Sequence, residues 1–242
     1  MMDTIKFNSG NTKVVAHRGL SGLETENTCA AFVAAGNRSY FGIETDVHRT
    51  ADGKFVVIHD DNTKRVGVDH LVVEETTFDT LRNLQLVDKD GQRGRSDLRI
   101  PTLAEYINIC KKYGKVAVLE LKNSFVQEDI DAIVEIIRGL EYLENVIFIS
   151  FDYNNLLKLR NTCPGQAAQY LIHKLDSWDE LIDRLVKDQL DLDAYYKLID
   201  KDIVDRLHAA GIVLNVWTCD DPEAGEQLAA WGVDQITSNI LE

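Results

Sequence analysis

The sequence predicts an α/β protein that folds as a single (β/α)8 barrel. Three observations lead to this prediction. Short β-branched runs alternate with longer amphipathic segments along the whole chain, which is the pattern of βα units sharing one parallel sheet. Eight strand candidates occur, a number that closes a barrel. The length of 242 residues, 45% of them hydrophobic, suits one barrel with one large core.

The strand candidates are short and rich in β-branched and aliphatic residues. They are residues 13–17, 42–47, 116–121, 146–150, 167–172, 190–195, 212–217 and 233–237. Helical periodicity lies between them, at residues 102–113, 130–140, 153–161, 177–187, 202–210 and 223–231. Gly114, Gly211 and Gly232 stand where a left-handed residue would end a helix just before the next strand. An open doubly wound sheet is the alternative, but no Gly-x-Gly-x-x-Gly turn follows the first strand.

One long interruption separates the second and third strand candidates. Residues 60–100 contain a single short apolar run, residues 68–73, and a charged loop at residues 89–99. This segment is too poor in core residues for a second domain. We therefore expect one barrel domain over residues 1–242, with a small insertion after the second strand.

Composition restricts the partners and the location. A formal net charge of -14 argues against nucleic acid, because nucleic acid affinity depends on Lys and Arg neutralising phosphates. The four cysteines are scattered and show neither zinc-site spacing nor a disulfide framework. Residues 1–10 lack the apolar core of a signal peptide, and no stretch is apolar enough to cross a membrane. We expect a cytoplasmic protein without stable membrane insertion; the oligomeric state is not predicted.

Four charged residues share the inward side of two neighbouring strands. Residues two apart in a strand face the same side, so Glu44 and Asp46 point together, as do Glu120 and Lys122. Three carboxylates in one barrel mouth would repel one another. Each close pair would cost several kcal/mol if the two charges are about 4 Å apart and the effective dielectric constant is about 20. A hard divalent cation with oxygen ligands would compensate them. The alternative is a plain ion pair of Glu44 or Glu120 with Lys122 or Arg18.

Two histidines end apolar runs close to these acids. A lone histidine such as His17 is ordinarily structural, but His59 ends a second run soon after the acidic pair. One could accept a proton while the other donates one, since an unperturbed pKa near 6.5 suits neutral pH. Arg18 and Lys122 lie beside them, and both side chains suit a phosphate group. His48 has the parity of the acids but lies past the strand, so we expect it on the rim.

The sequence resembles the glycerophosphodiester phosphodiesterase family. The blocks that carry the resemblance occur in the family's order and spacing across nearly the whole chain. They are His17-Arg18-Gly19, Glu26-Asn27-Thr28, Glu44-Thr45-Asp46-Val47, Thr50-Ala51-Asp52-Gly53, His59-Asp60, Arg65, Pro101-Thr102-Leu103, Leu119-Glu120-Leu121-Lys122, Ser150-Phe151 and Trp217-Thr218.

The resemblance implies a role for each matching residue. Glu44, Asp46 and Glu120 would bind one divalent cation, Mg or Ca. His17 and His59 would be the acid and base, and Arg18 and Lys122 would hold phosphate. The implied reaction is hydrolysis of glycerophosphodiesters to sn-glycerol 3-phosphate and an alcohol. In it, the free glycerol hydroxyl on the metal would attack phosphorus, and water would open the resulting cyclic phosphate. Trp217 would either wall the glycerol pocket or belong to the core.

The chain departs from the family's pattern at three places. Thr25 replaces a usual Pro, Asp220 replaces a common Asn, and Ser238-Asn239-Ile240 replaces the usual Asp-x-Pro. We expect these departures to affect the choice of headgroup alcohol. Two other functions stay open: a phospholipase-type lyase that stops at the cyclic phosphate, and a non-catalytic sensor of phosphate metabolites.

Overall fold

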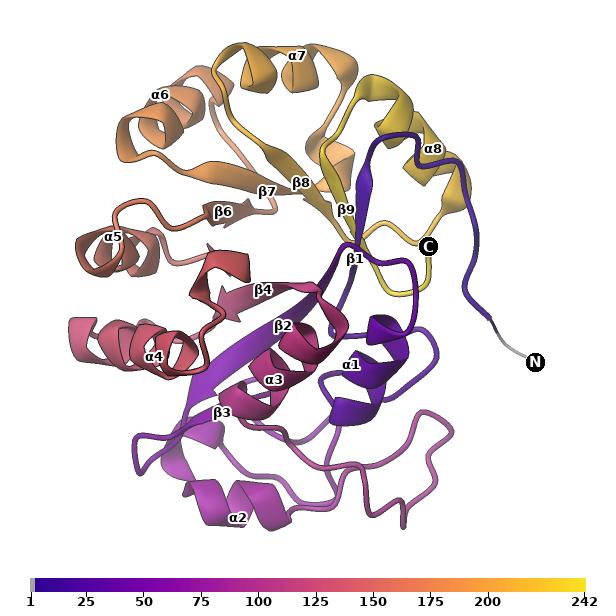
Figure 1. The fold of residues 1–242 in the computed structure, drawn as a ribbon, viewed down its shortest axis with the longest axis vertical. Helices are drawn as coiled ribbons and strands as arrows, with labels where there is room; N and C mark the ends of the chain where they lie inside the picture. Colours follow the sequence, from indigo (N-terminus) through magenta and orange to yellow (C-terminus); the bar gives the residue numbers. More distant parts are fainter. Residues whose placement is uncertain (1–2) are drawn as a thin grey trace.

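The computed structural model describes residues 3–242, so the first two residues of the predicted domain lie outside the described residues. Eight parallel strands close into a barrel, in the order β1-β9-β8-β7-β6-β5-β4-β2, with β2 paired back to β1 (Figure 1). They are β1 (Lys13–Ala16), β2 (Gly42–Arg49), β4 (Val116–Leu121), β5 (Val146–Ser150), β6 (Ala168–Ile172), β7 (Asp191–Tyr195), β8 (Leu214–Trp217) and β9 (Gln235–Ser238). The predicted barrel is confirmed.

Helices surround the strands on the outside of the barrel (Figure 1). They are α1 (Cys29–Gly36), α2 (Phe78–Asn83), α3 (Leu103–Tyr113), α4 (Gln127–Gly139), α5 (Tyr153–Thr162), α6 (Trp178–Asp188), α7 (Lys201–Ala209) and α8 (Pro222–Trp231), with 3-10 turns at Val73–Glu75, Leu143–Asn145 and Tyr196–Leu198. Six of the eight helices match predicted segments. α1 was not predicted, because its sequence is apolar around the whole circumference of the helix, Cys-Ala-Ala-Phe-Val-Ala-Ala-Gly. The short α2 was not predicted either.

Local chemistry sets where these helices begin and end. Thr102 and Glu105 form a reciprocal capping box at the start of α3, satisfying two backbone N–H groups that lack partners inside the helix. A single side chain accepts a backbone N–H at the start of four further helices: Asp152 at α5, Ser177 at α6, Asp200 at α7 and Asp221 at α8. Gly114, Gly211 and Gly232 have φ of 63°, 76° and 92°, as predicted for left-handed helix ends.

Alternation along the strands separates the core from the barrel interior. In β4, Leu119 and Leu121 face outward and belong to the main hydrophobic core beneath the helices. Val118 faces inward and packs with other interior residues of the barrel, Val15, Ile149 and Leu171. This parity leaves Glu120 inside, near the carboxyl end of the strand, which is the end where barrel active sites lie.

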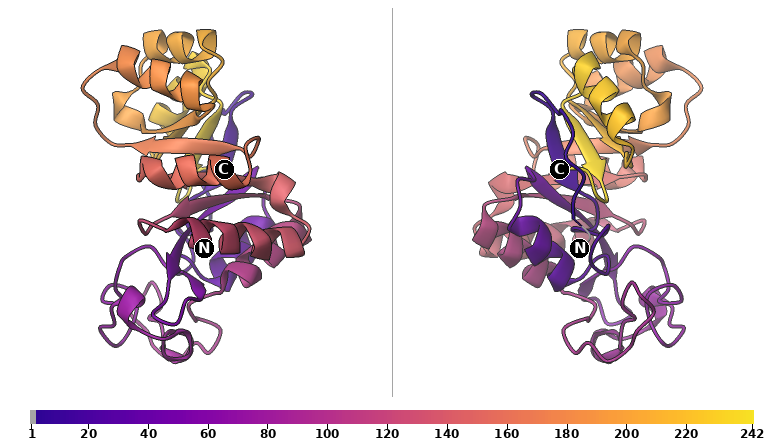
Figure 2. Two further views of the ribbon diagram at one scale, coloured as in Figure 1. Left: turned by 90° about the vertical axis from the view of Figure 1, so that its left-hand side faces the viewer. Right: turned by 90° about the vertical axis from the view of Figure 1, so that its right-hand side faces the viewer.

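A strand that was not predicted lies between β2 and the insertion. β3 (Phe55–Val57) runs antiparallel to β2, and the chain then passes through α2 before it re-enters the barrel at α3. Figure 2 shows this purple to magenta segment at one end of the molecule in both side views. It has a small hydrophobic cluster of its own, formed by Val56, Ile58, Val73, Leu81, Leu84, Leu86, Leu98 and Ile100. Across residues 3–242, no helix has the length and apolar character needed to span a membrane.

Candidate active site

Three carboxylates meet at the carboxyl end of the barrel. Glu44 and Asp46 come from β2, and Glu120 comes from β4, where its Cα is the direct register partner of Asp46. One oxygen from each residue lies within 4.8 Å of the other two. The three side chains are buried, with residue exposures of 3%, 0% and 7%. The structure thus brings the predicted carboxylates together, while their role as metal ligands stays a prediction.

Burial and mutual repulsion oppose ionisation of two of these acids. Burial, followed by the charge of Asp46, raises the pKa of Glu44 well above its ordinary value. The same two causes raise the pKa of Glu120 to about 7. Burial also opposes ionisation of Asp46, yet the nearby cations, Lys122 foremost, keep its pKa below the ordinary value. Burial and the charge of Asp46 therefore both disfavour a second and a third negative charge in this cluster.

The oxygen atoms of the cluster fit a hard divalent cation. Asn27 donates to Oδ2 of Asp46 at 2.7 Å, but within the described residues the buried Oδ1 of Asp46 has no hydrogen-bond partner. A buried acceptor without a partner is costly, and a cation would satisfy it. The donor set is entirely carboxylate oxygen, which suits Mg²⁺ or Ca²⁺ better than zinc.

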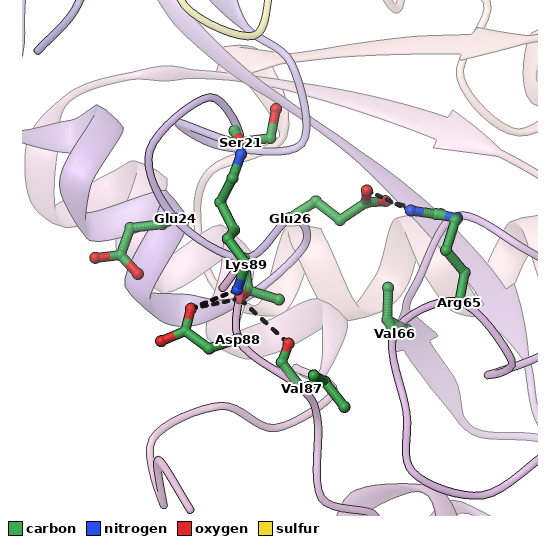
Figure 3. A pocket seen from close by; sticks show the side chains of 9 residues that line it. Ser21, Glu24, Glu26, Arg65, Val66, Val87, Asp88 and Lys89 are labelled. Atoms are coloured by element: carbon green, nitrogen blue, oxygen red, sulfur yellow. Dashed lines mark hydrogen bonds and ion pairs between the residues drawn. The ribbon is translucent and has the colours of Figure 1, made fainter. Parts of the chain in front are cut away.

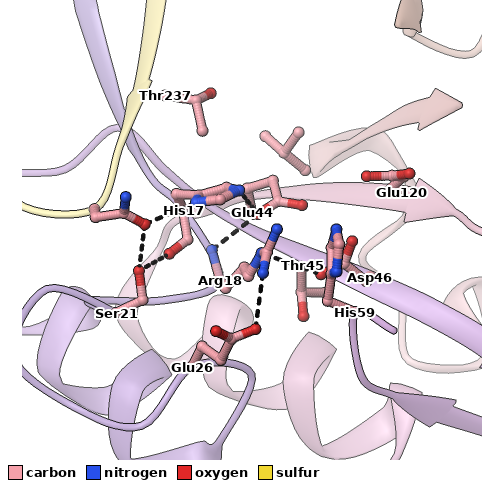
Figure 4. A network of polar contacts seen from close by, with 12 residues as sticks. His17, Arg18, Ser21, Glu26, Glu44, Thr45, Asp46, His59, Glu120 and Thr237 are labelled. Atoms are coloured by element: carbon pink, nitrogen blue, oxygen red, sulfur yellow. Dashed lines mark hydrogen bonds and ion pairs between the residues drawn. The ribbon is translucent and has the colours of Figure 1, made fainter. Parts of the chain in front are cut away.

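His17 follows β1 directly and lies in the wall of the site (Figure 4). Its Nδ1 is 2.7 Å from Oδ1 of Asn239, and its Nε2 is 3.9 Å from Oε2 of Glu44. Burial lowers the pKa of His17 to about 4, so the ring is neutral at physiological pH.

His59 lies on the insertion side of the same cavity. Its Nδ1 is 2.6 Å from Oδ1 of Asp60, whose carboxylate is held in turn by Arg65 at 2.8 Å. Burial lowers the pKa of His59, and Asp46 and Asp60 act in the opposite direction. His48 is not a rim residue, contrary to the prediction: it is 3% exposed, and its Nε2 contacts the backbone carbonyl of His59 at 3.1 Å. His48 does share the strand parity of Glu44 and Asp46, but β2 extends farther than predicted and includes it.

Arg18 and Lys122 both lie beside the carboxylates, as predicted. Nζ of Lys122 is 2.8 Å from Glu120 and 3.6 Å from Asp46. The guanidinium of Arg18 pairs with Glu26 at 2.8 Å and lies 3.8 Å from Asp46. Of the ion pairs that were the alternative to a metal site, the pair of Glu120 with Lys122 is present, whereas the guanidinium of Arg18 pairs with Glu26 and Asp46.

The backbone at Arg18 is held in an uncommon conformation. Its φ is 53°, in the left-handed region, where its N–H donates to Oε2 of Glu44 at 2.8 Å. The next residue has to be glycine, because a Cβ at Gly19 would lie 2.7 Å from the backbone of Ala31. This turn, which follows β1, thus fixes the position of Glu44 on the neighbouring strand β2.

An aromatic and aliphatic wall faces the charged side of the cavity. Ile149, Phe151, Leu171 and Trp217 line it across from His17, Arg18, Glu44, His59 and Glu120. Trp217 donates through Nε1 to the backbone carbonyl of Asp193 at 3.3 Å and packs edge-on against Phe151, with ring centroids 5.5 Å apart. The ring of Trp217 thus belongs to the cavity wall, and Phe151 stays 40% exposed beside it.

The sequence analysis missed Asp193 in β7. This carboxyl group lines the same cavity, is 1% exposed, and has an Oδ1 with no hydrogen-bond partner among residues 3–242. Burial, followed by the charge of Glu120, raises its pKa well above the ordinary value. The signal was present in the sequence, since Leu192 and Ala194 face outward and leave Asp193 inside.

A second cavity lies beside the first, between the loop before α1 and the insertion (Figure 3). Its lining includes Ser21, Glu24, Val66, Asp88 and Lys89. Glu26 and Arg65 also line it and pair with each other, while Glu26 reaches Arg18 on the side of the carboxylates. The two cavities therefore share a wall built from ion pairs.

Comparison with known proteins identifies the family. A sequence model of the Glycerophosphoryl diester phosphodiesterase family matches residues 17–241. The chain belongs to this family. A glycerophosphodiester phosphodiesterase from Caldanaerobacter subterraneus is 29% identical over 235 residues, covering 96% of this chain and 95% of that protein. The predicted family and enzyme class are thus confirmed.

Solved structures of family members have the same fold. A phosphodiesterase of Oleispira antarctica, solved with the product sn-glycerol-3-phosphate, superposes with a TM-score of 0.85. It is 28% identical, and the match covers 98% of this chain and 96% of that one. A glycerophosphodiester phosphodiesterase of Parabacteroides distasonis gives a TM-score of 0.78 at 29% identity, with coverage of 95% and 93%.

Proposed function

We propose that this protein hydrolyses glycerophosphodiesters, such as glycerophosphocholine or glycerophosphoethanolamine, to sn-glycerol 3-phosphate and an alcohol. One observation carries the proposal: three buried carboxylates, two histidines and two cationic side chains lie together at the carboxyl end of a barrel of this family, and five of these residues line one cavity, namely His17, Arg18, Glu44, His59 and Glu120. The product held by the Oleispira antarctica relative supports the same substrate class.

In this proposal Glu44, Asp46 and Glu120 hold one divalent cation, Mg or Ca. When bound, such an ion supplies positive charge that stabilises the charge developing on the phosphoryl oxygens. Arg18 and Lys122 bind the phosphate from the same side, and their ion pairs with the acids keep both side chains in place.

The two histidines differ in their surroundings, and this difference suggests their roles. His17 is held neutral by burial, so we assign it as the base that accepts the proton of the attacking hydroxyl. Asp60 faces Nδ1 of His59 and stabilises its protonated form, so we assign His59 as the acid. It donates the proton to the departing alcohol oxygen as the bond from phosphorus to that oxygen breaks.

The aromatic wall can bind the part of the substrate that lies beyond the phosphate. Phe151 and Trp217 present ring surfaces on the side of the cavity away from the acids. Such rings bind apolar groups and quaternary ammonium groups. We therefore assign Trp217 to substrate binding. A cytoplasmic location stays a prediction from the sequence.

A panel of glycerophosphodiesters, assayed with each metal after chelation, tests the proposal. We expect release of sn-glycerol 3-phosphate that is lost with chelator and restored by Mg or Ca. His17→Ala and His59→Ala should each lower kcat by roughly a hundredfold or more. His208→Ala is the matched control, because His208 pairs with Asp234 away from the cavity lining. Absence of hydrolysis with every metal and substrate would end the proposal.

A further inference from the structure

A chain of hydrogen bonds runs from His17 to the surface. Oδ1 of Asn239 lies 2.7 Å from Nδ1 of His17, and Nδ2 of Asn239 donates to Oδ2 of Asp220 at 2.6 Å. The backbone N–H of Asn239 also donates to Oδ1 of Asp220, at 2.8 Å. Asp220 and the segment Ser238-Asn239-Ile240 are two of the places where the sequence departs from the family's pattern, and Asn239 stands at the unrestricted middle position of that segment. We expected them to affect the headgroup, but the structure places both behind a histidine of the site.

The carboxylate of Asp220 determines which way the amide of Asn239 points. An ionised carboxylate only accepts hydrogen bonds, so the amide NH₂ group has to face Asp220. The amide oxygen then faces His17, and because this oxygen also only accepts, the proton of the neutral ring must be on Nδ1. Nε2 is left with a free lone pair, 3.9 Å from Glu44 and turned toward the carboxylates.

The turn that carries Asn239 is anchored by the same carboxylate. Ser238 at the end of β9 donates through Oγ to Asp220 at 2.8 Å, and this Oγ accepts the backbone N–H of Leu241 at 3.0 Å. Ser21 adds a hydroxyl 2.7 Å from Oδ1 of Asn239. Three hydrogen bonds to one carboxylate thus fix both the backbone and the side chain at residue 239.

We propose that Asn239 and Asp220 are positioning residues that hold His17 in the tautomer with a free Nε2. Neither residue lines the cavity of the carboxylates, so both act through His17. The inference rests on the proposed function for its kinetic consequence, since a base needs its free nitrogen directed at the reacting groups. The tautomer itself is independent of that function.

Three variants separate orientation from mere packing. Asp220→Asn removes the charge that orients the amide, and Asn239→Leu removes the amide at similar size. The double variant Asp220→Asn with Asn239→Asp exchanges the two groups. The carboxylate at position 239 is then an acceptor that faces Nδ1 of His17, and the amide at position 220 faces that carboxylate. Glu223→Gln, on the exposed first turn of α8, is the control for loss of one nearby negative charge.

Nitrogen-15 chemical shifts of the histidine rings, measured on the Mg- or Ca-loaded protein without substrate, report the tautomer directly. We expect His17 to be protonated on Nδ1 in the wild type and in the Glu223→Gln control, mixed in both single variants, and protonated on Nδ1 again in the exchanged double variant. The shifts of His208 should not change in any of them, which serves as a check that the fold is intact.

Kinetics supply the second readout. We expect kcat to fall by roughly tenfold to a hundredfold in the single variants with KM within about twofold, and to recover in the double variant to within about threefold of the wild type. A wild-type ring protonated on Nε2, or a double variant no better than the single ones, would overturn the inference. If the wild type hydrolyses no glycerophosphodiester, the proposed function fails while the nitrogen shifts still decide the tautomer.

Discussion

The substitution Glu44→Gln tests the metal site without any assay of activity. Gln keeps an oxygen that can accept the N–H of Arg18, as Glu44 does at 2.8 Å. At 4.8 Å, the largest separation of the three oxygens, two carboxylates repel by about 3.5 kcal/mol at an effective dielectric constant of about 20. Arg18 offsets part of this repulsion, so we expect the substitution to raise the free energy of unfolding of the metal-free protein by about 2 kcal/mol. For a chain of this size that raises Tm by about 4–8 °C.

The same substitution should abolish the response to metal. An ion present at a hundred times its Kd stabilises the folded state by about 2.7 kcal/mol, which raises the wild-type Tm by about 5–10 °C. Differential scanning fluorimetry with chelator and then with Mg or Ca measures both effects. Glu44→Gln should melt above the metal-free wild type and shift little when the ion is added. A lower Tm in chelator, or a metal shift as large as that of the wild type, would show that the three acids do not form the site.

Three further predictions concern other residues. Asp193→Asn should raise Tm by a few degrees at pH 7–8. The pKa of Asp193 is raised in the folded state, so the wild type loses stability as pH rises above the ordinary Asp pKa of about 3.9. Thermal scans at several pH values should show that the gain in Tm disappears below about pH 4. Glu242→Gln should lower Tm by about 2–6 °C at pH 7, since hydrogen bonds from Ser39 and Thr4 hold the pKa of Glu242 low despite its burial. The loss in Tm should vanish in acid, where Glu242 of the wild type is protonated and therefore neutral like Gln. Phe151→Ala should raise KM for glycerophosphocholine roughly threefold to tenfold with little change in kcat, and an equal fall in kcat would contradict a role in binding alone.

The fold was predictable where one face of an element is buried and the other is not. α3 to α8 show the 3.6-residue period, and the strands are short aliphatic runs, so their positions followed from pattern alone. The apolar α1 and the short α2 show no such contrast, and β3 was recognised as an apolar run but not as a strand. Its antiparallel pairing with β2 depends on the insertion folding back, which no local pattern reveals.

The site was predictable for a different reason. Parity within a strand fixes which side chains share a face, and all barrel strands present their carboxyl ends at one mouth, so Glu44, Asp46 and Glu120 could be brought together from spacing alone. Contacts made by loops are not set by such a rule. Asn239 meets His17 across 222 residues of sequence, and only the closure of β9 onto β1 brings them together. The departures at residue 220 and at residues 238–240 could therefore be seen in the sequence, but their effect could not.

The charge balance of the site explains why an acidic chain can act on an anionic substrate. The three carboxylates of the proposed ion site lie beside two cationic side chains, Arg18 and Lys122, so these five groups sum to one net negative charge when all are ionised. Burial is the first cause of the raised pKa values of Glu44 and Glu120, and the charge of Asp46 is the second. A divalent ion would change the balance to one net positive charge, which a phosphodiester with its single negative charge would neutralise. The whole-chain charge of -14 does not enter this balance, because a cleft is governed by the groups that line it. The prediction that follows is that substrate binding, like the metal shift in Tm, is lost when the ion is removed.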